Sequence, residues 1–198
     1  MSLVSKPAPG FTAKAAMPDG SIKPISLSDY KGKYVALFFY PFDFTFVCPS
    51  EILAFHHRSD KFAERNCQLL GVSIDSHHVH RAWRGTALED GGIGNISFPL
   101  VADVTKEIST NYGVLLPAGM ALRGFFLIDP DGVVQHELVN KLPIGRNADE
   151  AVRTLDAARF AASNPGQVCP AGWTPGKAAM GESADGVKTY LANYGEEL

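Results

Sequence analysis

The residues in this chain best suited to nucleophilic and redox chemistry are its three cysteines, Cys48, Cys67 and Cys169. A free thiol has a pKa of about 8.5, so only a few per cent of it is in the reactive thiolate form at neutral pH. Cys48 precedes Pro49, a residue suited to the first turn of a helix, where unsatisfied N–H groups favour an anion. Arg123 begins a strand-like run and could place a guanidinium beside that sulfur. Cys48 is therefore the candidate nucleophile.

The other two cysteines have different surroundings. Cys67 lies at the edge of an apolar run with no motif near it, and we interpret it as a small packed side chain. Cys169 lies in a tail that is rich in proline and glycine. Three cysteines this far apart do not resemble the dense, even-numbered framework of a small secreted domain.

Six histidines raise the question of a metal site. His77, His78 and His80 cluster, and His56 and His57 form a pair, but no cysteine accompanies either group along the chain. We interpret them as solvated or packing side chains and expect no metal. The chain has no G-x-G-x-x-G and no C-x-x-C-H motif, which predicts no nucleotide, flavin or haem cofactor. Electrons for a redox reaction would therefore come from another protein.

The elements that must position these side chains alternate between strands and helices. We expect strands at 34–40, 68–74, 98–101, 123–128 and 133–139, helices at 49–65, 77–88, 104–111, 147–163 and 184–194, and a small hairpin from 11–13 and 22–27. The continuous apolar run 34–40 predicts a central strand buried on both faces. This order suits an α/β, thioredoxin-like sheet with extra elements.

Composition suggests one domain and a tail. The proline- and glycine-rich character after residue 163 predicts a domain at 1–163 and a C-terminal tail at 164–198. A formal net charge of −3 with no basic block argues against a nucleic-acid partner. No stretch reaches the ~18 apolar residues of a membrane span, and the N-terminus does not resemble a signal peptide. We therefore expect a cytoplasmic protein.

Several sequence blocks now point to a family. Residues 41–48, Pro-Phe-Asp-Phe-Thr-Phe-Val-Cys, match the P-x-x-x-T-x-x-C signature of peroxiredoxins. The chain resembles the typical two-cysteine group over essentially its whole length, because further matching blocks follow in order: Phe39-Tyr40-Pro41, Cys48-Pro49-Ser50-Glu51, 71–77, the Trp83 region, Arg123-Gly124, 129–132 and 168–173. One block would be a moderate signal, and several distant blocks in order are a strong one.

This resemblance implies a thiol-dependent peroxidase that reduces hydrogen peroxide and organic hydroperoxides. The Cys48 thiolate would attack the peroxide and become a sulfenic acid. Thr45 and Arg123 would bind the peroxide oxygens, and Pro41 would shield the sulfur from water. Cys169 would then resolve the sulfenic acid by forming a disulfide between two subunits.

Four further residues match positions around this centre, namely Glu51, Arg146, Tyr40 and Trp83. An acid–base pair between Glu51 and Arg146 would hold the active arginine in place. A disulfide needs Cα atoms within about 7 Å of each other, so we expect the segments around both cysteines to unfold locally in each cycle.

The resemblance also implies partners. The group forms homodimers that assemble into decamers, and we expect both here. Thioredoxin is the first choice of electron donor, because the Gly91-Gly92-Ile93-Gly94 loop and the long tail resemble thioredoxin-linked members; a flavoprotein disulfide reductase is the alternative. Members that are readily over-oxidised carry a Tyr-Phe pair where this chain has Tyr190-Leu191, which predicts intermediate sensitivity to sulfinic acid formation.

Two other functions remain to be weighed against the peroxidase. A thiol–disulfide oxidoreductase of the thioredoxin type would share the fold, but Cys48-Pro49-Ser50-Glu51 lacks the second cysteine of C-x-x-C. A holdase chaperone, in the oligomeric or over-oxidised form, could coexist with peroxidase activity.

Overall fold

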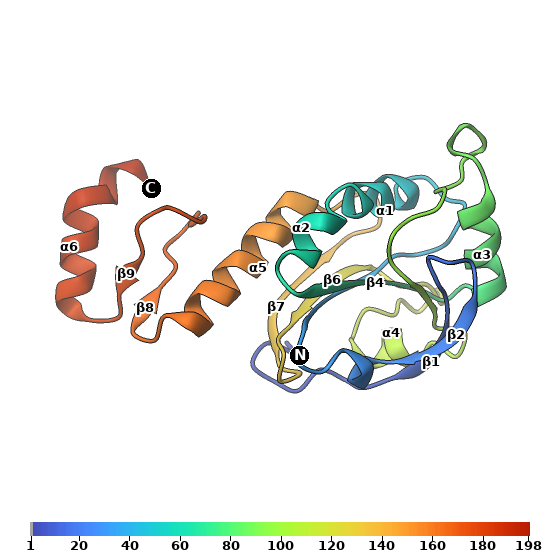
Figure 1. Ribbon diagram of the computed structural model, residues 1–198, viewed down its shortest axis with the longest axis horizontal. Helices are drawn as coiled ribbons and strands as arrows, with labels where there is room; N and C mark the ends of the chain where they lie inside the picture. The colour runs from blue at the N-terminus through green and yellow to red at the C-terminus, as the bar shows by residue number, and fades with distance from the viewer. Residues whose placement is uncertain (1) are drawn as a thin grey trace. The chain divides into compact units, whose positions relative to one another are not determined.

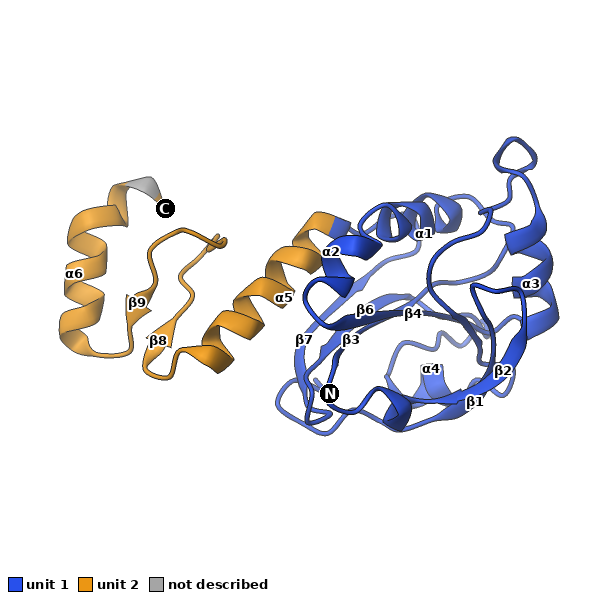
Figure 2. Ribbon diagram, viewed as in Figure 1, with its two compact units in different colours: residues 1–148 blue, residues 149–198 orange. Residues whose placement is uncertain are grey.

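The computed structural model describes residues 2–198, apart from the side chain of Glu197. The chain forms two compact units, one extending to Ala148 and the other covering Asp149–Leu198 (Figure 2). The first unit contains the large sheet and Cys48, and the second contains Cys169. Among the described residues, no helix is both long and apolar enough to cross a membrane.

A mixed seven-stranded sheet forms the first unit (Figure 1). Its strands are β1 (Thr12–Ala16), β2 (Ile22–Ser26), β3 (Tyr34–Phe39), β4 (Cys67–Ser73), β5 (Leu100–Ala102), β6 (Arg123–Ile128) and β7 (Val134–Asn140), in the spatial order β2-β1-β5-β4-β3-β6-β7. Strands β3, β4 and β5 are parallel neighbours, and β6 and β7 add an antiparallel hairpin. The β1–β2 hairpin extends the sheet beyond β5 and confirms the small N-terminal hairpin expected from 11–13 and 22–27.

Helices connect these strands and form most of the second unit. They are α1 (Cys48–His56), α2 (Ser59–Ala63), α3 (His77–Gly85), α4 (Glu107–Asn111), α5 (Ala148–Ser163) and α6 (Ala184–Tyr194), with short 3₁₀ helices at Leu27–Tyr30, Leu88–Asp90 and Gly195–Glu197. The second unit also contains the two-residue strands β8 (Gln167–Val168) and β9 (Met180–Gly181), which pair antiparallel.

The predicted central strand is β3, and each of its residues is buried. Successive side chains of a strand point to opposite faces, so the two faces of β3 join different clusters. Val35, Leu37 and Phe39 pack on one face with apolar residues from the neighbouring strands and α4. Phe38 packs on the other face, where its ring stacks on that of Phe55 in α1 with centroids 4.5 Å apart. This second contact ties the helix that begins with Cys48 to the middle of the sheet.

The main correction to the predicted elements concerns the helix expected at 49–65. It forms two helices, α1 and α2, separated at His57 and Arg58. Arg58 leaves helical geometry with φ −112°, and its guanidinium donates to the carbonyl of Ala54, a group left free at the end of α1. The expected helix at 77–88 also ends early, at Gly85, whereas α6 has the predicted bounds. The helix that carries Cys48 is therefore only nine residues long.

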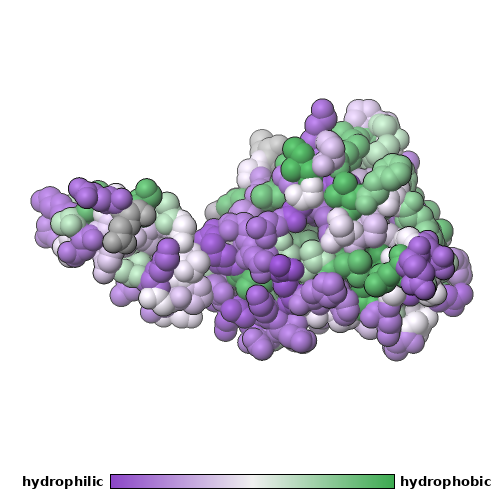
Figure 3. Space-filling view, turned by 90° about the horizontal axis from the view of Figure 1, so that it is seen from above, coloured by the Kyte–Doolittle hydropathy of each residue, from purple (hydrophilic) through white to green (hydrophobic). Residues whose placement is uncertain are grey.

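Apolar side chains are not confined to the core. Figure 3 shows green areas interspersed with purple ones on the visible face of the larger unit. Within the described part of the chain, the most exposed large apolar side chain is Phe46, at 96%, and Phe44 is 51% exposed. Both belong to the loop that leads from β3 to Cys48, which therefore presents aromatic surface beside the candidate nucleophile.

We expect Phe55→Ala to destabilise the protein by about 3–5 kcal/mol, because it removes a fully buried ring that packs between Phe38 and Phe125 and leaves a cavity. Urea unfolding followed by circular dichroism measures this loss. The matched control is Phe46→Ala, which truncates an exposed ring and should change the free energy of unfolding by less than about 0.5 kcal/mol. Equal losses in the two variants would contradict the packing described here.

Candidate active site

Cys48 is the first residue of α1, and it is fully buried. The Thr45 hydroxyl lies 3.0 Å from its sulfur and 2.8 Å from the carbonyl oxygen of Phe42. A hydroxyl has a single proton, so it can donate to only one of these groups at a time. When the sulfur is a thiol, the hydroxyl can donate to Phe42; when it is a thiolate, the hydroxyl can turn to the sulfur. Thr45 can therefore follow the charge state of Cys48.

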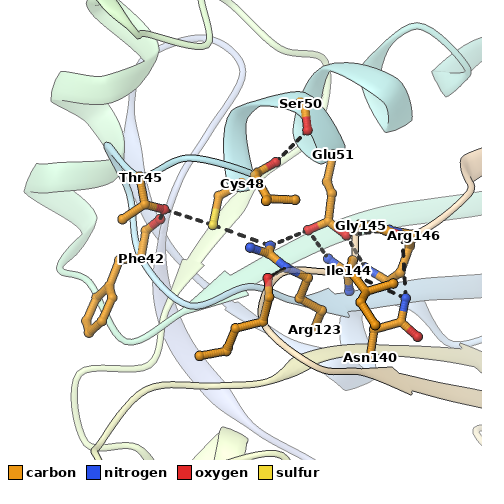
Figure 4. Close-up of polar contacts among 12 residues, drawn as sticks. Phe42, Thr45, Cys48, Ser50, Glu51, Arg123, Asn140, Ile144, Gly145 and Arg146 are labelled. Carbon is orange, nitrogen blue, oxygen red and sulfur yellow. Dashed lines mark hydrogen bonds and ion pairs between the residues drawn. The ribbon is translucent and has the colours of Figure 1, made fainter.

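Arg123 approaches the same sulfur from β6. Its Nη1 lies 3.5 Å from Cys48 Sγ and donates to Glu51 Oε2 at 2.6 Å. Its Nε donates to the carbonyl of Leu142 at 2.6 Å. The dashed lines in Figure 4 join Thr45, Cys48, Arg123 and Glu51 in one continuous chain. Glu51 and Leu142, which belong to different segments, thus hold the Arg123 guanidinium beside the Cys48 sulfur.

Strand pairing explains why residues so distant in the sequence meet here. Strands β3 and β6 are antiparallel, and Phe38 pairs with Phe125. The first residue of β6, Arg123, therefore lies where β3 ends and the loop to Cys48 begins. Glu51 is three residues after Cys48, so it lies one turn further along α1 and faces the same strand.

Glu51 holds a second cation, Arg146. Three N–H groups of Arg146 donate to its carboxylate: Nε at 2.7 Å, Nη2 at 2.9 Å and the backbone N–H at 2.8 Å. Arg146 Nη1 donates to the carbonyl of Gly124, and the guanidinium carbon lies 5.4 Å from the centre of the Phe38 ring. Glu51, Arg123 and Arg146 are all buried, with at most 4% of each side chain exposed. One carboxylate thus faces two guanidinium groups, which leaves an excess of positive charge beside Cys48.

The pKa of Glu51 reflects this arrangement. Burial by itself would raise it, but the hydrogen bonds and charge of Arg146, with a further contribution from Arg123, hold the pKa of Glu51 below its ordinary value. Burial lowers the pKa of Arg146, and Glu51 opposes that shift. The carboxylate and the guanidinium groups therefore stabilise one another in their charged forms.

A pocket lies beside Thr45 and Arg123, the two residues that contact the sulfur. It encloses about 450 Å³ and is lined by Pro41, Phe42, Thr45, Phe46, Val47, Met120, Arg123, Leu142 and Pro143. Thr45 and Arg123, the two groups that contact the sulfur, are the polar members of a lining that is otherwise apolar. Pro41 lies in this wall.

Tyr40 and Trp83 contact residues of the loop that leads to Cys48. The Tyr40 hydroxyl donates to Asp43 Oδ1 at 2.8 Å, and the ring of Trp83 lies 6.1 Å from that of Tyr40 and 5.7 Å from that of Phe44. Trp83 Nε1 donates to the carbonyl of Gly91. These two residues therefore support the loop at 41–47 through packing and Asp43.

Cys169 belongs to the second unit. Its thiol lies 3.6 Å from the carbonyl oxygen of Ala157 in α5 and is partly exposed. Burial raises the pKa of Cys169, and the nearby Arg153 opposes the rise. Arg153 also donates to the carbonyl of Trp173, whose ring lies 4.7 Å from that of Phe160. All three cysteines are free thiols, and Cys67 is buried at the start of β4.

Two polar residues near the site were not predicted from the sequence. Asp43 occupies a variable position of the P-x-x-x-T-x-x-C block, and His80 was grouped with the other histidines. His80 is fully buried and its Nδ1 lies 2.7 Å from Asp43 Oδ2. The only sequence feature that pointed to a buried His80 was its spacing from Trp83. Residues three apart lie on the same face of a helix, and Trp83 is buried on α3. Within residues 2–198, no group of three or more His, Cys, Asp or Glu side chains could hold a metal ion.

Comparison with known proteins identifies the class. The AhpC/TSA family profile matches residues 4–137, and the profile of the C-terminal domain of 1-Cys peroxiredoxin matches residues 157–193. Peroxiredoxin-2 of Bos taurus is 50% identical over 96% of this chain and 96% of its own length. Thioredoxin peroxidase of Echinococcus granulosus is 49% identical over 97% of this chain and 99% of its own length.

A solved structure supports the same family assignment. The reduced 2-Cys peroxiredoxin of Plasmodium vivax superposes with a TM-score of 0.94 at 50% identity, covering 97% of this chain and 100% of that one. The fold is thus thioredoxin-like, and the chain is a thiol-dependent peroxidase. It belongs to the AhpC/TSA family of peroxiredoxins. The relatives named here are peroxidases, which favours this function over that of a holdase chaperone.

We expect Thr45→Val to slow the reaction of Cys48 with hydrogen peroxide by about 10²-fold, because a methyl group replaces the hydroxyl that contacts the sulfur. Thr45→Ser keeps the hydroxyl and should retain most of the rate. Stopped-flow kinetics under single-turnover conditions would measure both. A Thr45→Val protein as fast as the Thr45→Ser protein would show that the hydroxyl is not used.

We expect Glu51→Gln to cost about 3–5 kcal/mol of stability at pH 7, because it leaves two buried guanidinium groups without a carboxylate.

The lowered pKa of Glu51 also fixes the sign of the dependence of stability on pH. Its stabilisation is fully present above the ordinary value of about 4.3 and is lost as pH falls through the lower folded value. Urea unfolding between pH 3 and 7 should therefore show a shallower acid decline in Glu51→Gln than in the wild type.

The matched control is Glu89→Gln, which changes an exposed glutamate. Its unfolding free energy should follow the wild type at every pH. An acid decline in Glu51→Gln as steep as that of the wild type would mean that Glu51 is not ionised in the folded protein.

Proposed function

We propose that Cys48 is the peroxidatic residue of this peroxidase and that Thr45 and Arg123 bind the peroxide. The observation that carries the proposal is the convergence on a single sulfur of one hydroxyl and one guanidinium that also line a pocket. Pro41 and the rest of the pocket wall would limit the access of water. Glu51 and Arg146 would keep Arg123 in place, and Tyr40 and Trp83 would support the loop.

In the first step, the Cys48 thiolate attacks one oxygen of the hydroperoxide. A sulfur–oxygen bond forms, the oxygen–oxygen bond breaks, and the departing alkoxide or hydroxide takes up a proton. The sulfur is oxidised by two electrons to a sulfenic acid, and the peroxide is reduced to an alcohol or water. Charge that develops on the oxygens would be stabilised by the Arg123 guanidinium and the Thr45 hydroxyl.

The pocket supports a substrate range that includes organic hydroperoxides. Its apolar wall, with Phe42, Met120 and Leu142, offers contacts for an alkyl group, and its volume of about 450 Å³ leaves room for one. Hydrogen peroxide needs only the polar contacts of Thr45 and Arg123.

We infer that Cys169 is the resolving residue, carried by a mobile tail at 164–198, and that the disulfide joins two subunits. The Cys169 thiol would attack the sulfur of the sulfenic acid, forming the sulfur–sulfur bond and releasing water. Because the Cys48 sulfur is fully buried, the first turn of α1 must unwind before any disulfide can form. The short length of α1 favours such local opening.

The proposed electron donor is thioredoxin, with a flavoprotein disulfide reductase as the alternative. The name of the Echinococcus granulosus relative supports the first choice, and likeness to the AhpC of Enterococcus faecalis, at 38% identity and a TM-score of 0.80, supports the second. Assembly beyond a homodimer, into a decamer, is proposed as well. A structure of Plasmodium yoelii Prx1a, modified at its N-terminus, is described as an artifactual octamer, which supports a tendency to oligomerise.

Two further inferences concern location and inactivation. Three free thiols fit a reducing compartment, and we propose the cytoplasm, although one similar structure is that of a mitochondrial protein of Plasmodium falciparum. Leu191 in place of a second aromatic residue in α6 supports intermediate sensitivity to over-oxidation.

The test is one equivalent of hydrogen peroxide added to reduced protein, followed by a non-reducing gel. The wild type should run at twice the mass of one chain, and both Cys48→Ser and Cys169→Ser should remain monomeric because each lacks one sulfur of the disulfide. Cys67→Ser is the matched control and should dimerise like the wild type. Wild-type protein that consumes peroxide but stays monomeric would contradict resolution between subunits, and dimerisation of Cys48→Ser would contradict the assignment of Cys48.

A further inference from the structure

In the second unit, the segment that carries Cys169 packs along one face of α5. Arg153, Ala157 and Phe160 recur at helical spacing, so they lie on the same face of that helix. The Cys169 thiol lies 3.6 Å from the carbonyl oxygen of Ala157, and the ring of Trp173 lies 4.7 Å from that of Phe160. Helix α5 is therefore the support on which the thiol rests.

Arg153 is held at two points on this face. Its Nε and Nη2 each donate to the carboxylate of Glu150 at 2.7 Å, and this bidentate pairing fixes the plane of the guanidinium. Its Nη1 donates to the carbonyl oxygen of Trp173 at 3.0 Å, and the backbone N–H of Trp173 donates to the carbonyl of Pro170. A guanidinium has more N–H groups than these three contacts use, so it can also donate to a sulfur.

The contact between Cys169 and Ala157 suits a thiol and not a thiolate. A backbone carbonyl can only accept a hydrogen bond, so it stabilises the S–H form, whereas a thiolate would face the oxygen with no hydrogen between them. Burial acts in the same direction, because it raises the pKa of Cys169, and the charge of Arg153 opposes that rise. Since the thiolate is the nucleophile, Arg153 favours the reactive form.

Other charged side chains occur on the two segments. They are Asp149, Glu150, Asp156 and Arg159 on α5, and Lys177 in the segment 164–177. Glu150 is engaged with Arg153, and Arg159 is exposed. Arg153 is the charged group that acts on the pKa of Cys169.

We propose that Arg153 is a positioning residue for the second step of the catalytic cycle. It holds the turn at 170–173 through the Trp173 carbonyl, and it stabilises the Cys169 thiolate when the sulfur leaves the Ala157 carbonyl. This inference rests on the proposed role of Cys169 as the resolving residue.

The step that Arg153 would assist is balanced without another reductant. The Cys169 thiol loses its proton to solvent, and the thiolate attacks the sulfur of the Cys48 sulfenic acid. A sulfur–sulfur bond forms, the sulfur–oxygen bond breaks, and the departing hydroxide takes up a proton to give water. In formal count, the Cys48 sulfur gains one electron and the Cys169 sulfur loses one.

The first experiment measures the alkylation of Cys169 by iodoacetamide as a function of pH, in a Cys48→Ser and Cys67→Ser background with a single thiol. Alkylation needs the thiolate but no peroxide, so it tests Arg153 independently of the proposed function. Arg153→Gln keeps an N–H donor for Trp173 and removes the charge, so the midpoint of its pH profile should move upward.

Two further variants separate charge from structure. Arg153→Lys keeps the charge, and its midpoint should lie closer to that of the parent than the midpoint of Arg153→Gln does. Arg159→Gln is the matched control, because it removes an exposed arginine from the same helix, and it should keep the parent profile. An unchanged midpoint in Arg153→Gln would overturn the proposal.

The second experiment measures the rate of disulfide formation in the full chain after one equivalent of hydrogen peroxide, with acid quenching and non-reducing gels. At pH 7, Arg153→Gln should be slower by at least ~3-fold. A higher pKa lowers the thiolate fraction more than it raises the nucleophilicity of the thiolate, since the Brønsted coefficient is about 0.4–0.5. At a pH where both thiols are ionised, the variant should be at least as fast as the wild type, because its thiolate is more basic.

A purely structural role of Arg153 predicts the same loss of rate at every pH, and that result would overturn the proposal. Failure of the proposed function would look different. Wild-type protein would then form no disulfide between Cys48 and Cys169, while the alkylation profiles would still differ between the parent and Arg153→Gln.

Discussion

One buried carboxylate that faces two guanidinium groups organises this site. Glu51 accepts hydrogen bonds from Arg123 and Arg146, and the charge that remains uncompensated lies beside the Cys48 sulfur. Burying three charges carries a desolvation cost that is offset only when every polar atom finds a partner. Here Leu142 and Gly124 provide carbonyls for the remaining N–H groups, and the Phe38 ring lies close to the Arg146 guanidinium. The position of Arg123 therefore depends on α1, β6 and the segment after β7 together.

The loop that ends at Cys48 is held from two sides. On one side, Glu51 and Arg123 hold the start of α1 against β6. On the other, Asp43 and His80 hold the loop against α3, and Phe44 keeps a left-handed backbone between the two attachments. Such strain persists only where the surrounding contacts are strong. The proposed reaction with peroxide would benefit from this rigidity, because it needs several groups within hydrogen-bond distance of one sulfur.

The proposed disulfide would make the opposite demand on the same segment, which must open for the bond to form. Cys48 is inaccessible in the folded helix, whereas Cys169 is partly exposed in a proline- and glycine-rich segment of the second unit. The tail has little buried apolar surface; no residue of α6 is buried. Segments with few buried contacts open at low cost. In the proposed cycle, a rigid state that meets peroxide alternates with a locally opened state in which the two sulfurs can join.

The sequence by itself determined the features that depend on neighbouring residues. The apolar run at 34–40 predicted the buried central strand, the block at 41–48 marked Cys48 as the candidate nucleophile, and the bounds of α6 were predicted directly from the chain. Only the tertiary structure decided the rest. Arg146 meets Glu51 across 95 residues and His80 meets Asp43 across 37, because strand order and helix docking bring them together. A buried, hydrogen-bonded histidine and an exposed one are the same letter in the sequence, since burial and hydrogen-bond partners are properties of the fold.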